Sequence, residues 1–271
     1  MSIKKFSVDD QIFAPLRFSI CGKTKVGKTT LAATLPNNHI VNFSQVDAKF
    51  REVEIEKSDV GDSFFTLRKM AVNGEFDLDH YYYVTDWKEY EETLHDIVHE
   101  FRVGKNEPLP TITIDDSRNW RFFARDEFEK VEGHVPIKYE WSKITDMLKS
   151  GLKYIRSNGF SVILIHQMKE RYDAQDRATG EFVGEYYPNP DTAQYLADLI
   201  GELSIKVDVN GKRYREFKID TNGDRLGNVC DVNYSDTIIN PTMLDIYRQV
   251  GIEKYRWPKE WQDLPDPIPE L

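Results

Sequence analysis

Cysteine is scarce in this chain, and its scarcity excludes two kinds of scaffold. Only Cys21 and Cys230 occur among 271 residues, far apart and with no CxxC pair. A disulfide framework needs several cysteines, and a structural zinc site needs closely spaced cysteines or histidines. We therefore expect a reducing compartment and a fold held together by its apolar core, which 40% hydrophobic and 13% aromatic residues can supply.

Long apolar runs and an excess of positive charge are also missing. No uninterrupted apolar run reaches the length of a membrane span, and none follows the two lysines in MSIKKFSVDD. We therefore expect a cytoplasmic protein that does not associate with membranes. The net charge is −10, from 46 acidic and 36 basic residues. This balance excludes a protein that coats nucleic acid with its whole surface, so any such contact must be local.

Short apolar strands alternate with helical patterns along the first two thirds of the chain. Strands are predicted at 16–21, 39–43, 81–85, 111–114 and 160–165, with a weaker one at 64–70. Helices are predicted at 28–35, 87–103, 120–130 and 139–157. This alternation predicts an α/β fold in which a central, mostly parallel sheet is flanked by helices on both faces.

The last third of the chain has a different pattern. Residues 202–209 and 212–219 flank Asn210-Gly211 and predict a β-hairpin, because Asn-Gly supplies the positive φ angles of a tight turn. A helix at 241–250 and a proline-rich tail follow. We therefore divide the chain into an N-terminal segment (1–14), a core with its C-terminal hairpin (15–220) and a terminal helix with the tail (221–271).

The strongest motif is a phosphate-binding loop. Residues 22–29 read Gly-Lys-Thr-Lys-Val-Gly-Lys-Thr and match GxxxxGK[ST], after a predicted strand and before a predicted helix. Lys28 is expected to reach the β and γ phosphates of ATP, and the Thr29 hydroxyl to bind Mg²⁺. The predicted nucleotide-binding residues are Gly22, Lys23, Thr24, Lys25, Val26, Gly27, Lys28, Thr29 and Thr30.

A carboxylate at the end of the strand 111–114 completes the predicted site. Strand residues that end in an acid suit a Walker B strand, and Asp115 is the expected acid on the metal side. Asp116 has two interpretations: it polarises the attacking water, or it caps the following helix.

Two polar residues follow the apolar strand 160–165, where ligands of open α/β sheets bind. His166 and Gln167 are each candidates to sense the γ-phosphate, and a pair that merely ends the strand is the alternative.

The stretch 168–190 is polar and too long for an ordinary connection. Basic groups attract phosphates and aromatic faces stack on unpaired bases, so the combination suits single-stranded DNA. A subunit interface in which Lys169 or Arg171 reaches a neighbour's nucleotide, and a solvated loop, are the alternatives. The basic residues are Lys169, Arg171 and Arg177, and the aromatic residues are Tyr172, Phe182, Tyr186 and Tyr187.

Taken in order, these segments resemble the RecA-like core ATPases, particularly the small phage nucleotide-binding proteins grouped with RecA-type single-strand annealing proteins. The resemblance spans about 15–204 and rests on PLRFSICGKTKVGKTTLAATLP, YYVTDWKEY, TITIDDS, ILIHQMKERYDAQDRATGEF and ADLIGELS. It implies a RecA-like P-loop NTPase that binds ATP and Mg²⁺, assembles with copies of itself and binds single-stranded DNA. It also implies partner proteins of phage replication or recombination, and hence the host cytoplasm.

The chain departs from the RecA pattern at one position. RecA-type enzymes place a water-activating glutamate after the strand that follows the P-loop helix, and IVNFSQ has Gln45 there. A neutral amide cannot accept a proton as a carboxylate does. We therefore expect slow hydrolysis, or substitution by Asp116 or Asp47. The predicted catalytic residues are Lys28, Gln45, Asp116 and Gln167.

Other classes of P-loop protein are alternatives. Lys23 has the spacing of the additional lysine in ParA and MinD-like dimerising ATPases, but Thr24 and Lys25 follow it where those proteins have glycines. A nucleotide-gated adaptor of the helicase-loader type would contact proteins rather than DNA. A small-molecule kinase would need an arginine-rich lid, and the sequence shows no such cluster.

Overall fold

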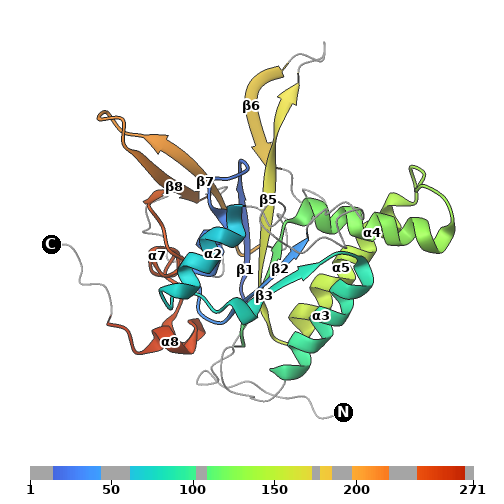
Figure 1. The fold of residues 1–271 in the computed structure, drawn as a ribbon, viewed down its shortest axis with the longest axis horizontal. Coiled ribbons are helices and arrows are strands. Elements are labelled where there is room, and N and C mark those ends of the chain that lie inside the picture. Colours follow the sequence, from blue (N-terminus) through green and yellow to red (C-terminus); the bar gives the residue numbers. More distant parts are fainter. Residues whose placement is uncertain are drawn as a thin grey trace.

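A computed structural model describes residues 15–43, 62–101, 109–172, 178–184, 197–219 and 237–265 (Figure 1). For 62–65, 171–172 and 178–184 it describes the backbone alone. Gln45, Asp47 and Arg177 therefore lie outside the described residues, as does the side chain of Arg171. Within the described part, no helix combines the length and apolar character needed to cross a membrane.

The described residues form one nine-stranded sheet, which organises the fold. Its order is β3-β2-β4-β5-β1-β7-β8-β9, and β6 pairs with β5 off this path. The first six strands of that order are parallel, while β8 and β9 continue the sheet in antiparallel fashion. The bounds are β1 Arg17–Gly22, β2 Asn38–Phe43, β3 Tyr81–Val84, β4 Thr111–Asp115, β5 Ser161–Tyr172, β6 Ala178–Gly184, β7 Leu199–Val207, β8 Arg213–Ile219 and β9 Thr237–Ile239.

Helices cover both faces of this sheet, and strand alternation explains why. On β5, Val162 and Leu164 pack with the helices of one face, and Ile163 and Ile165 pack toward the other. In Figure 1, α3, α4 and α5 lie together on one side, and α2, α7 and α8 on the other. The bounds are α1 Lys28–Ala33, α2 Asp62–Val72, α3 Trp87–Glu100, α4 Ser117–Glu132, α5 Trp141–Ser157, α7 Met243–Gln249 and α8 Lys259–Gln262, with short 3₁₀ turns η2 Leu78–His80 and η3 Lys254–Arg256. The predicted α/β class with a C-terminal hairpin is confirmed.

Three local predictions were wrong. The strand predicted at 64–70 is helix α2, whose buried Leu67 and Met70 are spaced three residues apart, as one helical face requires. The stretch after residue 165 is not simply a loop, because β5 continues to Tyr172 and pairs with β6 as a projecting ribbon. A ribbon with little core to cover needs no apolar alternation, so its sequence carried no strand signal.

The third correction concerns the turn of the β7–β8 hairpin. Only Gly211 of the Asn-Gly pair has a positive φ, 79°. The Gly211 N–H donates to the Asp208 carbonyl at 3.0 Å, and the Asp208 N–H to the Lys212 carbonyl at 2.9 Å. The loop is therefore one residue longer than a tight two-residue turn and needs a single left-handed position.

The strand order places three functional segments side by side. β5 lies between β1, which leads into the predicted phosphate loop, and β4, which ends in Asp115. The register aligns Gly22 at the end of β1 with Gln167 on β5. The carboxyl edge of the sheet therefore brings the loop, the acid and Gln167 together.

Candidate active site

The phosphate loop has the predicted strand, turn and helix. β1 ends at Gly22, and α1 begins at Lys28 after a left-handed Gly27 with φ 97°. The Leu31 N–H donates to the Gly27 carbonyl at 2.9 Å, which is the first turn of α1. Lys25 also has a positive φ, 66°. The backbone N–H groups at the start of α1 are therefore free of helical partners and available to an anion.

Lys28 lies folded across this loop. Its Nζ donates to the carbonyls of Gly22 at 2.8 Å and Lys23 at 2.9 Å, and to Gln167 Oε1 at 3.1 Å. Burial lowers the pKa of the ammonium group, and the carboxylates of Asp115 and Asp116 oppose that shift. All three acceptors are neutral, so anionic phosphate oxygens can replace them with stronger bonds in which both partners are charged.

Asp115 and Thr29 meet as the motifs predict. The Thr29 hydroxyl donates to Asp115 Oδ2 at 2.7 Å, and the side chain of Asn42 donates to the same oxygen at 3.4 Å. Burial raises the pKa of Asp115 to about 6, and neighbouring Asp116 adds to the shift while the Thr29 hydrogen bond opposes it. A hydroxyl and a carboxylate supply hard oxygen ligands of the kind Mg²⁺ prefers.

The raised pKa of Asp115 predicts a pH dependence of nucleotide binding. Below pH 6 the carboxyl group is mainly protonated and loses its attraction for Mg²⁺, whereas above pH 6 it is ionised. We expect the magnesium-dependent part of the affinity for ATP to weaken up to about tenfold per pH unit below 6. The readout is the difference in affinity for MgATP between wild type and Asp115→Asn, measured from pH 5 to 8. This difference isolates Asp115, because the phosphate groups of ATP change protonation equally in both experiments. Parallel curves for the two proteins would contradict this assignment.

Asp116 caps helix α4, which was one of its two predicted roles. Its Oδ1 accepts the Asn119 N–H at 2.9 Å, and its Oδ2 accepts from Gln167 Nε2 at 2.8 Å. The peptide bond between Asp115 and Asp116 is cis. Both carboxylate oxygens thus already have a donor, and each of these hydrogen bonds lowers the basicity that Asp116 would need to polarise a water.

Gln167 and His166 have different environments although they are adjacent. Gln167 lies in the site, where its Oε1 accepts from Lys28 at 3.1 Å and from Thr24 Oγ1 at 3.3 Å. His166 is fully buried, with Nδ1 2.7 Å from Ser117 Oγ and Nε2 3.4 Å from Ser19 Oγ. Successive strand side chains point to opposite faces. Gln167 can therefore respond to a γ-phosphate, and the hypothesis that His166 does so is wrong.

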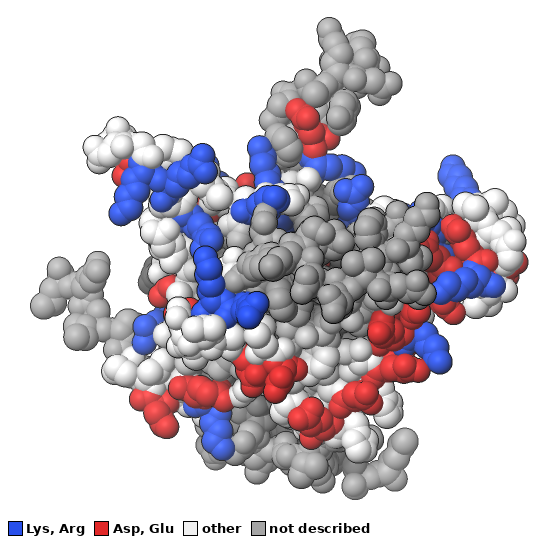
Figure 2. Space-filling view, viewed as in Figure 1, with Lys and Arg blue, Asp and Glu red and all other residues white. Residues whose placement is uncertain are grey.

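Of the predicted DNA-binding residues, Lys169 and the backbone of Arg171 lie on the ribbon above this site. Lys169 is exposed on β5, two residues beyond Gln167 and paired with Val183 of β6. Figure 2 shows Lys and Arg gathered around the base of the ribbon and on the β7–β8 hairpin, whereas acidic groups dominate the lower part of the same face. The basic surface is therefore local, on a chain with an overall negative charge.

Sequence reasoning missed two residues that contact the site. Asn42, which bonds Asp115, is a polar residue inside the apolar strand IVNF, and that interruption was a usable signal. Arg215 on β8 donates from Nε to the carbonyl of Val26 in the phosphate loop at 3.2 Å. Nothing in the hairpin sequence distinguishes Arg215 from its basic neighbours.

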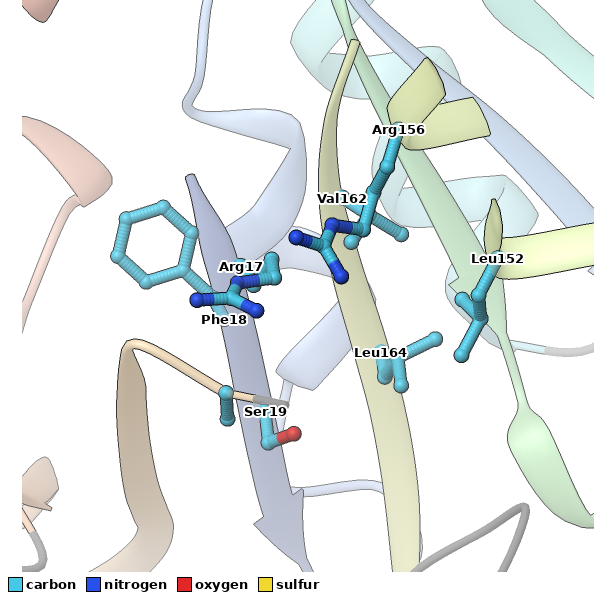
Figure 3. Close-up of a pocket in the computed structure, with 8 residues that line it drawn as sticks. Arg17, Phe18, Ser19, Leu152, Arg156, Val162 and Leu164 are labelled. Atoms are coloured by element: carbon cyan, nitrogen blue, oxygen red, sulfur yellow. The ribbon is translucent and has the colours of Figure 1, made fainter. Parts of the chain in front are cut away.

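A small cavity at the opposite edge of the sheet is not a nucleotide site. It lies at the amino ends of β1 and β5, beside Arg17, Leu152, Arg156 and Leu164 (Figure 3). Its volume of about 20 Å³ holds roughly one water molecule. Arg17 is paired there with the carboxylate of Asp198.

The parallel sheet, the phosphate loop and the Thr29–Asp115 pair together define a P-loop nucleoside triphosphatase fold. The family model described as an AAA domain matches residues 14–225, and the chain belongs to this family of P-loop ATPase domains. Comparison with curated proteins gives no significant match. Among solved structures, the chain is similar to a KaiC-like protein from the archaeon Pyrococcus horikoshii. That match has a TM-score of 0.43 and 14% identity, and covers 83% of this chain and 89% of that one.

Proposed function

We propose that this protein binds ATP with Mg²⁺ at residues 22–30 and hydrolyses it slowly while acting on single-stranded DNA. The observation that carries the nucleotide proposal is the 2.7 Å contact between Thr29 and Asp115, beside a lysine that already points into the loop. The loop N–H groups and Lys28 would hold the phosphates. Thr29 and Asp115 would hold Mg²⁺, which when bound neutralises charge on the phosphate oxygens.

The arrangement of the acidic groups supports slow hydrolysis. Proton abstraction from water needs a carboxylate of sufficient basicity in reach, and each hydrogen bond that a carboxylate accepts lowers its basicity. Asp115 is committed to Thr29, and both oxygens of Asp116 accept hydrogen bonds. Of the two, Asp116 is the better candidate base, because Asp115 is assigned to Mg²⁺ and because loss of the bond from Gln167 would raise the basicity of Asp116 without uncapping α4. Gln45, another of the predicted catalytic residues, lies outside the described residues.

Gln167 supports a coupling between nucleotide and DNA. It contacts Lys28 at one end of its amide and Asp116 at the other, and it shares strand β5 with exposed Lys169. A γ-phosphate that draws Lys28 away would remove one of the partners of Gln167. The strand β5, which carries Lys169 and Arg171, would then bind DNA or a neighbouring copy, and we propose that Arg177 takes part in this contact. We also propose that the protein assembles with copies of itself and acts with partner proteins of phage replication or recombination.

A gel-shift measurement tests the DNA proposal. We expect ATP-loaded protein to retard a labelled single-stranded oligonucleotide at low salt, and the retardation to fade as salt rises. The variant Lys169→Ala/Arg171→Ala should keep its affinity for ATP and bind the oligonucleotide at least about fivefold more weakly, because two phosphate contacts are lost.

The matched control is Lys149→Ala/Lys153→Ala, which removes the same charge from helix α5. This control should bind DNA like the wild type. Equal losses in both double variants would show a general charge effect and no dedicated surface. If the wild type gives no retardation even at low salt, the adaptor alternative replaces the DNA proposal.

A further inference from the structure

The β7–β8 hairpin packs against both ends of the phosphate loop. A Cβ atom built on Gly22 would lie 2.4 Å from the carbonyl oxygen of Leu203 on β7. A Cβ atom built on Gly27 would lie 2.8 Å from Nε of Arg215 on β8. Both distances are too short for real atoms, so the two glycines of the motif also mark where the hairpin touches the loop.

Arg215 is held in place from its other side. Its backbone N–H donates to Asn240 Oδ1 at 2.9 Å, and its carbonyl accepts the Asn240 N–H at 2.7 Å. Asn240 directly follows β9, the outermost strand of the sheet. The backbone of Arg215 is therefore fixed, and its side chain reaches from this frame to the Val26 carbonyl at 3.2 Å.

The bond to Val26 constrains a second group through the peptide plane. In a trans peptide the C=O and the following N–H point in opposite directions. The Val26–Gly27 bond is trans. With the Val26 carbonyl turned toward Arg215, the Gly27 N–H must point away from the hairpin.

We propose that Arg215 is a positioning residue for the phosphate loop, which fixes the Gly27 N–H as a donor to the bound phosphates. This inference rests on the proposed binding of ATP. Without the bond to Arg215 the Val26–Gly27 peptide can rotate, and the loop must be ordered again when the ligand binds. Arg215 acts through the backbone, since its guanidinium contacts a carbonyl that points away from the Gly27 N–H.

Calorimetric titrations with MgATP and with inorganic tripolyphosphate test this role. We expect Arg215→Ala to weaken both ligands about fivefold to thirtyfold, because one charge-assisted bond that orders the loop is lost. Arg215→Met keeps the aliphatic stem and should show the same loss. The matched control is Arg213→Ala, which removes an equal charge two residues away on the same face of β8. It should bind both ligands like the wild type.

A second measurement separates positioning from folding. The melting temperature of the ligand-free variants should stay within about 2 °C of the wild type, because Arg215 is an exposed side chain. Wild-type affinities in the Arg215 variants, or an equal loss in Arg213→Ala, would overturn the inference while leaving the proposed function intact. A wild type that binds neither ligand would refute the proposed function, and this inference with it.

Discussion

Lys28→Ala should lower the affinity for MgATP by at least a hundredfold. Lys28 is the only buried lysine among the described residues. In the free protein its ammonium group donates to two loop carbonyls and to Gln167. With ATP bound, at least two charge-assisted bonds to phosphate should replace those to the carbonyls. Each is worth about 1.5–3 kcal/mol, and a hundredfold loss corresponds to about 3 kcal/mol. Isothermal titration calorimetry with ATP and Mg²⁺ measures the effect.

Lys23→Ala is the matched control for that substitution. Lys23 belongs to the same loop and carries the same charge, but its side chain is exposed. Its loss should change the affinity less than about threefold, since exposed charges are largely screened. Circular dichroism spectra should show that both variants remain folded. An unchanged affinity in Lys28→Ala would refute the assignment of the loop. A loss of turnover in Lys23→Ala would instead favour the ParA-like alternative.

Asp115→Asn should abolish the magnesium dependence of binding and lower turnover by at least about a hundredfold. Asparagine has nearly the same shape and can still accept the 2.7 Å hydrogen bond from Thr29. It has no negative charge, however, and charge is what holds Mg²⁺ beside the phosphates. We expect wild-type affinity for ATP to rise with Mg²⁺ at pH 7.5, and the affinity of the variant to be the same with Mg²⁺ or with EDTA.

Asn42→Ala serves as the control for this second substitution. It removes the weaker 3.4 Å contact to the same carboxylate oxygen and leaves the charge in place. The magnesium dependence should therefore survive in Asn42→Ala, with at most a severalfold loss of affinity. If Asp115→Asn kept both its magnesium dependence and its turnover, another group would hold the metal and the Walker B assignment would be wrong.

The parts of the site's geometry that the sequence predicted correctly lie in a contiguous motif or directly after a recognisable strand. The phosphate loop is a contiguous motif whose chemistry fixes both its residue types and its flanking strand and helix. Asp115 could be placed because parallel strands end at one edge of a sheet, and the structure brings it to Thr29 as expected. The cap at Asp116 was also predictable, since a carboxylate before a helix accepts N–H groups of its first turn.

The parts that sequence missed depend on contacts between distant segments. Arg215 meets Val26 across 189 positions, and no local pattern marks that meeting. His166 and Gln167 are adjacent polar residues, and only the direction of each side chain separates a buried residue from one in the site. The β5–β6 ribbon projects from the sheet, so it lacks the apolar alternation by which strands are recognised.

A crystal structure with a nonhydrolysable ATP analogue and Mg²⁺ is the most direct test of the account. It should show the triphosphate enclosed by residues 22–29, with Lys28 Nζ moved from the Gly22 and Lys23 carbonyls to phosphate oxygens, and the metal between Thr29 and the Asp115 side of the site. A nucleotide bound elsewhere, or a loop that still has Lys28 folded onto its own carbonyls with the analogue at saturation, would contradict it.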